Sequence, residues 1–446
     1  MKPRLILAAL VALVCAAVVA VVGTAAATSD RHDPPSSYEV WLIDQEDKYQ
    51  GGAGTLHIFD GEQLAEDAST AVPESIDLAG ELASLCQERT GSVPLRPHML
   101  VFNGGDDDGR SGSRYAVIAY VASGHVAFLR ADERKPVECI DVGTQAHAAW
   151  PTPDQRHLIV GNQNGKKLQR IATDYRHERF TLEDAATIDL ATCTTPSGAA
   201  CQDPELRPDN APICPRTTSD GDFSFVTLRG GGMFVVDHNR TPMQIVAEYD
   251  RAHVDDNGCG EMEAAGRMYV NSGAGLTVPP ASGDEPYGHD VYSFELDSFS
   301  EIPRTTPNRP RATHVYTRDA PGARVDAHAV GTTPRGLLWW GDRIQNDVTV
   351  VDPRLNRVVS RFSLENELSD DPAPDLFDLS PDGRYMFTSL RGPNPSSGYE
   401  AFGSTPGVGV IKVRWGGRSG RLSGVARVGS IRGTPDPHAI RVRVVR

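Results

Sequence analysis

Four histidines occupy the same place in a repeated phrase of the chain, and they are the residues whose type and spacing most clearly indicate chemistry. His147 and His328 are each followed, six residues later, by a proline that opens a turn and then by an apolar run. His98 and His438 each follow a proline and open an apolar run directly. Because a structural repeat can gather equivalent residues in space, and zinc and copper both bind imidazole nitrogen, the pattern predicts a transition-metal site.

The composition indicates an all-β protein with many turns. The 446 residues include 43 glycines and 32 prolines, and 7% of the chain is aromatic. The formal net charge of −15 argues against nucleic acid or an anionic membrane surface as the main partner, because both attract basic patches. A metal ion, a small molecule or a protein remains as the expected partner.

Residues 1–27 read as a segment separate from the rest. Lys2 and Arg4 precede an apolar run over residues 5–22, and small residues at 24–27 offer a cleavage site. We expect either a signal peptide or an uncleaved N-terminal membrane anchor, since the run is nearly long enough to span a bilayer. Either form predicts an extracytoplasmic protein (secreted, periplasmic or anchored), with a linker over 28–36 and the folded domain over 37–446.

One repeat unit is legible between residues 375 and 428. Apolar runs at 375–379, 385–390, 407–413 and 421–428 read as four strands, and Pro381-Asp382-Gly383 forms the first turn. Four antiparallel strands per unit is the pattern of a propeller blade.

The same phrase recurs along the chain and predicts a seven-bladed β-propeller. The last copy, which opens at His438, retains a single strand. The strands at 38–44 and 54–60 are not preceded by a copy of the repeated phrase. Joining the two ends closes a seventh blade and removes an open edge, although the insertions leave counts of six or eight open. We call the position that the four histidines occupy in the repeated phrase the anchor position. Along the chain it is occupied by His98, His147, Ile213, Gly258, His328, Asp375 and His438.

These repeats resemble the YVTN-type seven-bladed propellers. The resemblance rests on Ser380-Pro381-Asp382-Gly383-Arg384-Tyr385 and on Thr152-Pro153-Asp154, and the repeat covers nearly all of the chain after the N-terminal segment. The broad group includes lactonase-like, nitrous-oxide-reductase-like and methanethiol-oxidase-like propellers. The chain departs from the consensus where Gln155 replaces the turn glycine and Arg335 replaces the aspartate.

Equivalent positions in a propeller form a ring around the central channel. In blade order the ring carries His328, Asp375, His438, His98 and His147 as five consecutive residues, which we expect to bind copper or zinc at the channel mouth. The alternative is that each histidine hydrogen-bonds the neighbouring backbone and ties one blade to the next.

The cysteines other than Cys15 are even in number, which favours disulfides in an exported protein. Cys214 and Cys259 each lie one residue after the anchor of adjacent blades, so we expect them to pair. The alternative for these two is thiolate ligation of a metal, with Glu261 nearby. A second pair brackets a short loop, and the remaining two cysteines form the third. The expected pairs are Cys214–Cys259, Cys193–Cys201 and Cys86–Cys139.

Two functions from different classes follow. The first is a propeller that binds a transition metal or a small ligand at the channel mouth, for which the resemblance implies copper-dependent oxidoreductase chemistry if it is an enzyme. The second is a non-enzymatic scaffold that grips a protein or glycan through insertions at 193–212, 274–290, 303–325 and 391–406. Lactonase-type hydrolysis remains open by fold alone, but the ring offers a single carboxylate for it.

Overall fold

A computed structural model of the protein describes residues 37–46, 52–104, 113–255, 259–272, 289–299, 304–318, 325–397 and 401–445. The expected N-terminal segment, the anchor Gly258 and most of the insertion at 274–290 lie outside the described residues. Within these ranges, no helix has both the length and the apolar character that a membrane span requires.

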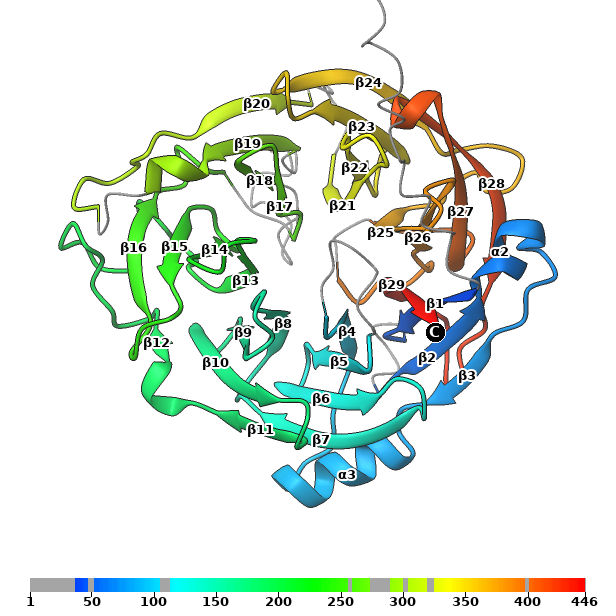
Figure 1. Ribbon diagram of the computed structural model, residues 1–446, viewed down its shortest axis with the longest axis horizontal. Helices are drawn as coiled ribbons and strands as arrows, with labels where there is room; N and C mark the ends of the chain where they lie inside the picture. Colours follow the sequence, from blue (N-terminus) through cyan, green and yellow to red (C-terminus); the bar gives the residue numbers. More distant parts are fainter. Residues whose placement is uncertain are drawn as a thin grey trace, which may run out of the picture. The chain divides into compact units, whose positions relative to one another are not determined.

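The described strands form seven sheets arranged around a common centre, which confirms the predicted seven-bladed all-β propeller (Figure 1). Each sheet is a meander of four antiparallel strands, and the second to be completed along the chain has an extra short strand. In each blade but the closing one, the strands run from the centre to the rim in chain order (Figure 1).

Six blades are each built from one continuous stretch of chain. The first three consist of β4 (Pro97–Phe102), β5 (Tyr115–Tyr120), β6 (His125–Arg130) and β7 (Lys135–Asp141); β8 (Ala146–Pro151), β9 (His157–Asn162), β10 (Lys167–Asp174), β11 (Arg179–Leu182) and β12 (Ile188–Asp189); and β13 (Pro212–Thr217), β14 (Ser224–Leu228), β15 (Met233–Asp237) and β16 (Gln244–Tyr249). The next three consist of β17 (Met262–Ala264), β18 (Arg267–Asn271), β19 (Asp290–Glu295) and β20 (Thr313–Thr317); β21 (Ala327–Thr332), β22 (Leu338–Asp342), β23 (Asp347–Asp352) and β24 (Arg357–Ser363); and β25 (Pro374–Leu379), β26 (Tyr385–Leu390), β27 (Gly407–Arg414) and β28 (Ser419–Arg427).

The seventh blade joins the two ends of the propeller, as predicted. Its strands, from the centre outward, are β29 (Pro437–Val445), β1 (Ser37–Asp44), β2 (Thr55–Asp60) and β3 (Glu74–Asp77). β29 pairs antiparallel with β1, with Leu42 opposite Ile440. The pairing gives the innermost strand of the blade a partner and leaves no open sheet edge between the first blade and the last.

The repeated turn has a common hydrogen-bond pattern that explains its sequence. Ser380 Oγ donates to Asp382 Oδ1 at 2.7 Å, the Arg384 N–H donates to the same oxygen at 2.9 Å, and Gly383 adopts a φ of +70°. In the second complete blade Gln155 takes this left-handed conformation instead, with a φ of +58°. Its side-chain amide donates to the Thr152 carbonyl at 3.1 Å, which offsets part of the conformational cost of a non-glycine residue.

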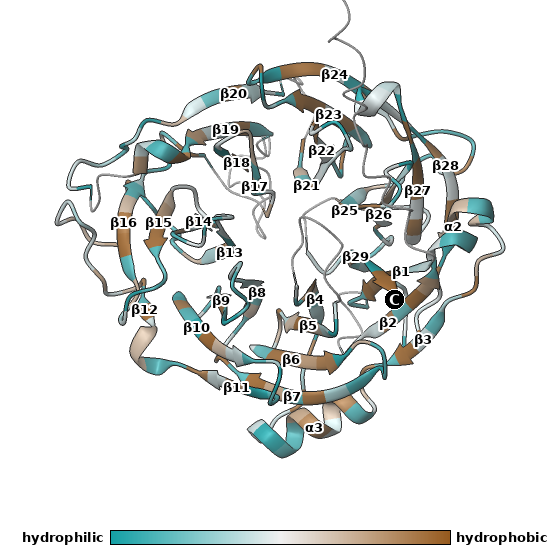
Figure 2. Cartoon of the chain, viewed as in Figure 1, coloured by the Kyte–Doolittle hydropathy of each residue, from teal (hydrophilic) through white to brown (hydrophobic). Residues whose placement is uncertain are grey.

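The core lies between the faces of neighbouring blades. Figure 2 shows apolar residues along the strands throughout the ring. Large side chains such as Trp41, Phe128 and Trp339 are fully buried there. This continuous packing between blades fixes the distance of each innermost strand from the centre.

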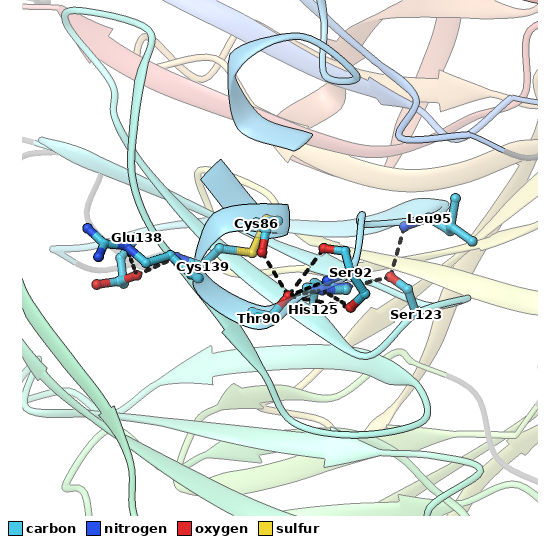
Figure 3. Close-up of a disulfide and its surroundings, with 9 residues drawn as sticks. Cys86, Thr90, Ser92, Leu95, Ser123, His125, Glu138 and Cys139 are labelled. Carbon is cyan, nitrogen blue, oxygen red and sulfur yellow. Dashed lines mark hydrogen bonds and ion pairs between the residues drawn. A yellow bond between two sulfur atoms is a disulfide. The ribbon is translucent and has the colours of Figure 1, made fainter. Parts of the chain in front are cut away.

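Two short α-helices, which the strand pattern did not predict, follow strands of the closing blade: α2 (Gly61–Asp67) and α3 (Glu81–Thr90). A disulfide between Cys86 and Cys139 attaches α3 to the outer strand β7 (Figure 3). At the end of α3, Thr90 Oγ1 lies 3.0 Å from Nε2 of His125 (Figure 3). Three short 3₁₀ turns complete the regular structure of the residues described above: η1 (Asp184–Ala186), η2 (Leu296–Phe299) and η3 (Trp415–Gly417).

The closing strand should contribute strongly to stability. Ile440 is fully buried on β29, so we predict that Ile440→Ala lowers the free energy of unfolding by about 3 kcal/mol through lost packing and a cavity. Ile431→Ala is a matched control because that side chain is 50% exposed, and it should change stability by less than about 0.5 kcal/mol. Urea unfolding followed by tryptophan fluorescence would measure both, and equal effects would contradict the packing described here.

Candidate metal centre

The five ring residues lie at the same position of five innermost strands. His98, His147, His328, Asp375 and His438 are each the second residue of β4, β8, β21, β25 and β29, respectively. Their side chains are between 0% and 9% exposed. They are therefore buried, whereas the sequence had predicted that they line the open mouth of the central channel. The blade repeat therefore brings all five together in a buried arc.

The imidazole rings follow one another along this arc. The ring centroids of His438 and His98 are 3.7 Å apart and stacked, and those of His98 and His147 are 4.6 Å apart. The His328 ring lies 5.4 Å from that of His438, with Asp375 from the intervening blade beside both. Four imidazoles therefore form a chain of ring contacts across five blades.

Hydrogen bonds tie three of the histidines to the next blade. His438 Nδ1 lies 2.8 Å from the carbonyl oxygen of His98, and His328 Nδ1 lies 3.1 Å from that of Asp375. The His147 ring is hydrogen-bonded to the backbone of Ile213, the equivalent residue of its neighbour. Since a carbonyl can only accept, Nδ1 of His438 and His328 carries the proton. The blade-to-blade tie that the sequence analysis offered as an alternative is present.

His98 is held differently, by a side chain from the closing blade. Its Nδ1 lies 3.2 Å from Oε1 of Gln45, a residue that directly follows β1. Gln45 Nε2 in turn donates to Asp436 Oδ2 at 3.0 Å, just before β29. The side-chain amide of Gln45 therefore connects His98 to the end of β1 and to the start of β29, the two strands that close the propeller.

The second ring nitrogens of His98 and His438 have no hydrogen-bond partner within the described structure, although both are buried. With the proton on Nδ1, each Nε2 presents a lone pair. His438 Nε2 also lies 3.5 Å from Oδ2 of Asp375, so two acceptors face each other. A buried acceptor without a donor typically costs about 1–3 kcal/mol, and a bound cation would remove that cost.

A chain of buried ion pairs surrounds Asp375. Arg343 Nη1 contacts Asp375 Oδ1 and Arg391 Nη1 contacts Asp375 Oδ2, both at 2.9 Å. At the outer ends of the chain, Arg343 binds Asp326 at 2.7 Å and Arg391 binds Asp436 at 2.7 Å. Every member is at most 2% exposed, so charge pairing inside the protein replaces hydration.

Both oxygens of Asp375 are therefore already engaged by cations. Burial opposes the ionisation of Asp375, but the neighbouring imidazole N–H groups and the two guanidinium groups outweigh it and hold its pKa well below the usual range. Asp375 Oδ1 also lies 2.8 Å from His328 Nδ1. This geometry suits Asp375 for orienting His328 from behind better than for binding an ion directly.

Burial keeps the four histidines neutral. It lowers the pKa of each one, for His147 to about 3, because the uncharged ring is favoured away from water. Neutral imidazole is the form that binds a metal ion. Donor atoms of His328, Asp375 and His438 all lie within 4.8 Å of one another, as do those of His147, Cys214 and Cys259.

Two arginines of this centre were not predicted from the sequence. Arg343 and Arg391 each directly follow the second strand of a blade, β22 and β26. Asp326 and Asp436 each precede an anchor histidine by two residues, as Asp-Ala-His and Asp-Pro-His. Both features recur within the repeat, so aligning the repeat units beyond the anchor could have identified these four residues.

The structure contains the three disulfides expected from the sequence: Cys86–Cys139, Cys193–Cys201 and Cys214–Cys259. Cys214 and Cys259 lie beside the histidine arc, since Cys214 Sγ is 3.9 Å from His147 Nδ1. Their sulfur atoms bind each other in this state rather than a metal.

Among solved structures, the chain is similar to several lactonase-like propellers. Periplasmic gluconolactonase of Pseudomonas aeruginosa matches with a TM-score of 0.54 at 15% identity, over 92% of this chain and 100% of that chain. A candidate 6-phosphogluconolactonase of Bacteroides uniformis matches with a TM-score of 0.56 at 13% identity, over 91% and 99%. A protein from Lactobacillus plantarum matches with a TM-score of 0.56 at 11% identity, over 91% and 99%.

No protein-family model matches the sequence, and no curated protein matches it either. At 11–15% identity the structural likeness concerns the fold. It confirms that the chain has the architecture of the lactonase-like seven-bladed propellers, while the chemistry of the arc has to be argued from its own residues.

The buried histidines predict a loss of stability in mild acid. The folded-state pKa of His147 is about 3 against 6.5 for the free group, so its stabilising effect is complete above pH 6.5 and is lost as the pH falls toward 3. Between pH 7 and pH 5, His147 alone should lower the free energy of unfolding by about 2 kcal/mol.

A His147→Gln variant cannot ionise at this position and should therefore lose less stability over the same pH range. Urea unfolding at a series of pH values would measure the difference between the two proteins. Identical pH dependence in both would mean that His147 is protonated as easily in the folded state as in the unfolded chain.

Proposed function

We propose that this propeller binds a transition metal ion through the Nε2 atoms of His98 and His438, with His328 beside them. The observation that carries the proposal is the pair of stacked rings, His98 and His438, whose buried Nε2 atoms have no hydrogen-bond partner within the described structure. A metal ion would give both lone pairs a partner.

The hydrogen bonds behind the rings support this role. Metal-binding histidines usually donate their other ring N–H to a carbonyl or carboxylate, which fixes the tautomer and the ring orientation. His438 donates to the His98 carbonyl, His328 contacts Asp375, and His98 contacts the Gln45 amide oxygen. The blade-to-blade ties and metal binding are therefore compatible, because they use different nitrogens of the same rings.

The charge around the arc favours copper in the Cu⁺ state. Burial raises the pKa of Asp326 to about 7 and raises that of Asp436, but each carboxylate contacts an arginine directly. With Asp326, Asp375 and Asp436 all ionised, the three aspartates and two arginines carry one net negative charge. A monovalent cation bound by neutral imidazoles would balance it, whereas Zn²⁺ would leave an excess positive charge away from water. Imidazole is a good ligand for copper, and a bound copper ion supplies one-electron redox chemistry.

We therefore propose copper-dependent redox chemistry or copper carriage as the function, outside the cytoplasm. Three disulfides support an oxidising compartment. Hydrolysis of a sugar lactone, which the names of two structural neighbours mention, has less support. Arg343 and Arg391 each already bind two aspartates, so neither guanidinium group is available to bind a lactone substrate.

Metal content tests the proposal directly. Residues 28–446, purified without chelators and offered Cu⁺ under argon, should retain about one copper ion per chain, measured by inductively coupled plasma mass spectrometry. His98→Gln combined with His438→Gln should lower the affinity for Cu⁺, measured by competition with a chromophoric chelator, by about tenfold or more.

The matched control is a double variant of two exposed histidines, His177→Gln with His253→Gln. These side chains are 55% and 43% exposed, and the variant should bind copper as the unchanged protein does. If the unchanged protein retains no copper, the histidines serve only to tie the blades together, and a protein- or glycan-binding scaffold becomes the favoured function. Tight binding of zinc with no copper would contradict the charge argument.

A further inference from the structure

The disulfide Cys214–Cys259 lies at the centre of the propeller, next to the end of the histidine arc. Cys214 is on β13, and Cys259 lies shortly before β17 of the next blade, with their Cα atoms 5.3 Å apart. Cys214 is fully buried and Cys259 is 5% exposed. Sγ of Cys214 is 3.9 Å from His147 Nδ1.

A buried acid lies on the same chain of contacts. Thr227 Oγ1 accepts a hydrogen bond from the Cys214 N–H at 3.4 Å and donates to Oε1 of Glu261 at 2.8 Å. Glu261 is itself only 5% exposed. The disulfide therefore has an imidazole beside it and a carboxyl group close to it.

The other two disulfides have a different environment. Cys86–Cys139 attaches α3 to the outer strand β7, and Cys193–Cys201 closes a nine-residue hairpin with a sequence separation of 8. Only Cys214 and Cys259 belong to a group of three potential metal ligands within the described residues. Cys214–Cys259 is therefore the disulfide whose cysteines could also bind a metal ion, whereas the other two disulfides are structural cross-links.

We propose that reduction of the Cys214–Cys259 disulfide creates a zinc site formed by the two cysteine thiolates and His147. This site goes beyond the proposed copper function and shares no ligand with it. An external dithiol reduces the S–S bond to two thiols and is itself oxidised to a disulfide. Zn²⁺ then displaces the two thiol protons and forms two Zn–S bonds. Reoxidation by an external disulfide, which is itself reduced to two thiols, re-forms the S–S bond and releases the ion.

The existing geometry needs little change. In a tetrahedral site with Zn–S bonds of about 2.3 Å and a Zn–N bond of about 2.0 Å, sulfur and nitrogen ligands lie about 3.5 Å apart. The Cys214 Sγ–His147 Nδ1 distance is already 3.9 Å. Once the S–S bond is broken, Sγ of Cys259 has to move away from that of Cys214 by a side-chain rotation.

The charge selects zinc for this second site. Two thiolates neutralise Zn²⁺, so the complex with neutral His147 carries no net charge in a buried environment, whereas Cu⁺ would leave one negative charge. The fourth position is left for a water molecule or for Glu261, whose carboxyl group Thr227 connects to the Cys214 backbone.

Cobalt provides a spectroscopic test, because Co²⁺ replaces Zn²⁺ and its bonds to thiolates give a charge-transfer band in the near ultraviolet. The propeller, residues 28–446, is reduced with a phosphine that is then removed, and is titrated with Co²⁺ without oxygen. We expect a band that saturates at one Co²⁺ per chain and disappears when Zn²⁺ is added. The oxidised protein should give no such band.

Matched variants assign the band to its ligands. Cys214→Ser with Cys259→Ser should abolish it, and Cys193→Ser with Cys201→Ser should leave it unchanged. His147→Gln should weaken Co²⁺ binding by about tenfold or more, as loss of one ligand does. His98→Gln with His438→Gln should keep the band, so failure of the copper proposal and failure of this one remain distinguishable.

Three results would overturn the proposal. The first is the absence of a band in reduced protein that retains its β-sheet circular dichroism. The second is loss of the folded state on reduction, because the site requires the packed blades. The third is a band that persists without Cys214 and Cys259, which would place the metal on other thiols.

Discussion

The pairing of β29 with β1 is the interaction on which the rest of this molecule depends. It extends from Ser37 opposite Val445 to Asp44 opposite Pro437 and makes the last strand of the chain the innermost strand of the seventh blade. That strand carries His438, which lies between Asp375 and His98 in blade order. Without this pairing the arc would be two separate pieces, so closing the fold and assembling the candidate centre are the same event.

The centre of the propeller combines polar groups that are each costly to bury alone. Arg343 and Arg391 pair with Asp326, Asp375 and Asp436 and thereby link three successive blades by charge. A buried ion pair often adds little net stability, but loss of one partner leaves an uncompensated charge and costs several kcal/mol. Such a network therefore fixes the relative position of the blades more than it strengthens their packing.

Much of the fold could be predicted from the sequence because the repeat encodes structure within a blade. The Ser/Thr-x-Asp turn, with Gly383 at its left-handed position in one copy, marks the start of the second strand in three blades. The anchor positions also predicted that His98, His147, His328 and His438 lie together and that Cys214 pairs with Cys259. Equivalent positions in adjacent blades must be neighbours, so position in the repeat was sufficient.

What could not be predicted depends on contacts between blades. The depth at which the arc is buried depends on how closely the seven sheets pack against one another. The sequence of a single repeat unit contains no information on that packing. Likewise, Arg343 and Arg391 reach a carboxylate of another blade, and their direction depends on the twist of the sheets. The helix α2 interrupts the strand pattern within the closing blade, between β2 and β3, and α3 interrupts it between that blade and the next one.

The shared seventh blade also sets the order in which the chain can finish folding. β1 and β2 are synthesised first, yet the partner that covers the inner edge of β1 comes after every other strand. During synthesis that edge stays unpaired while six blades form, and unpaired edges are where chains associate with one another. This architecture is therefore most vulnerable to aggregation while the chain is being synthesised, and less so after the ring has closed.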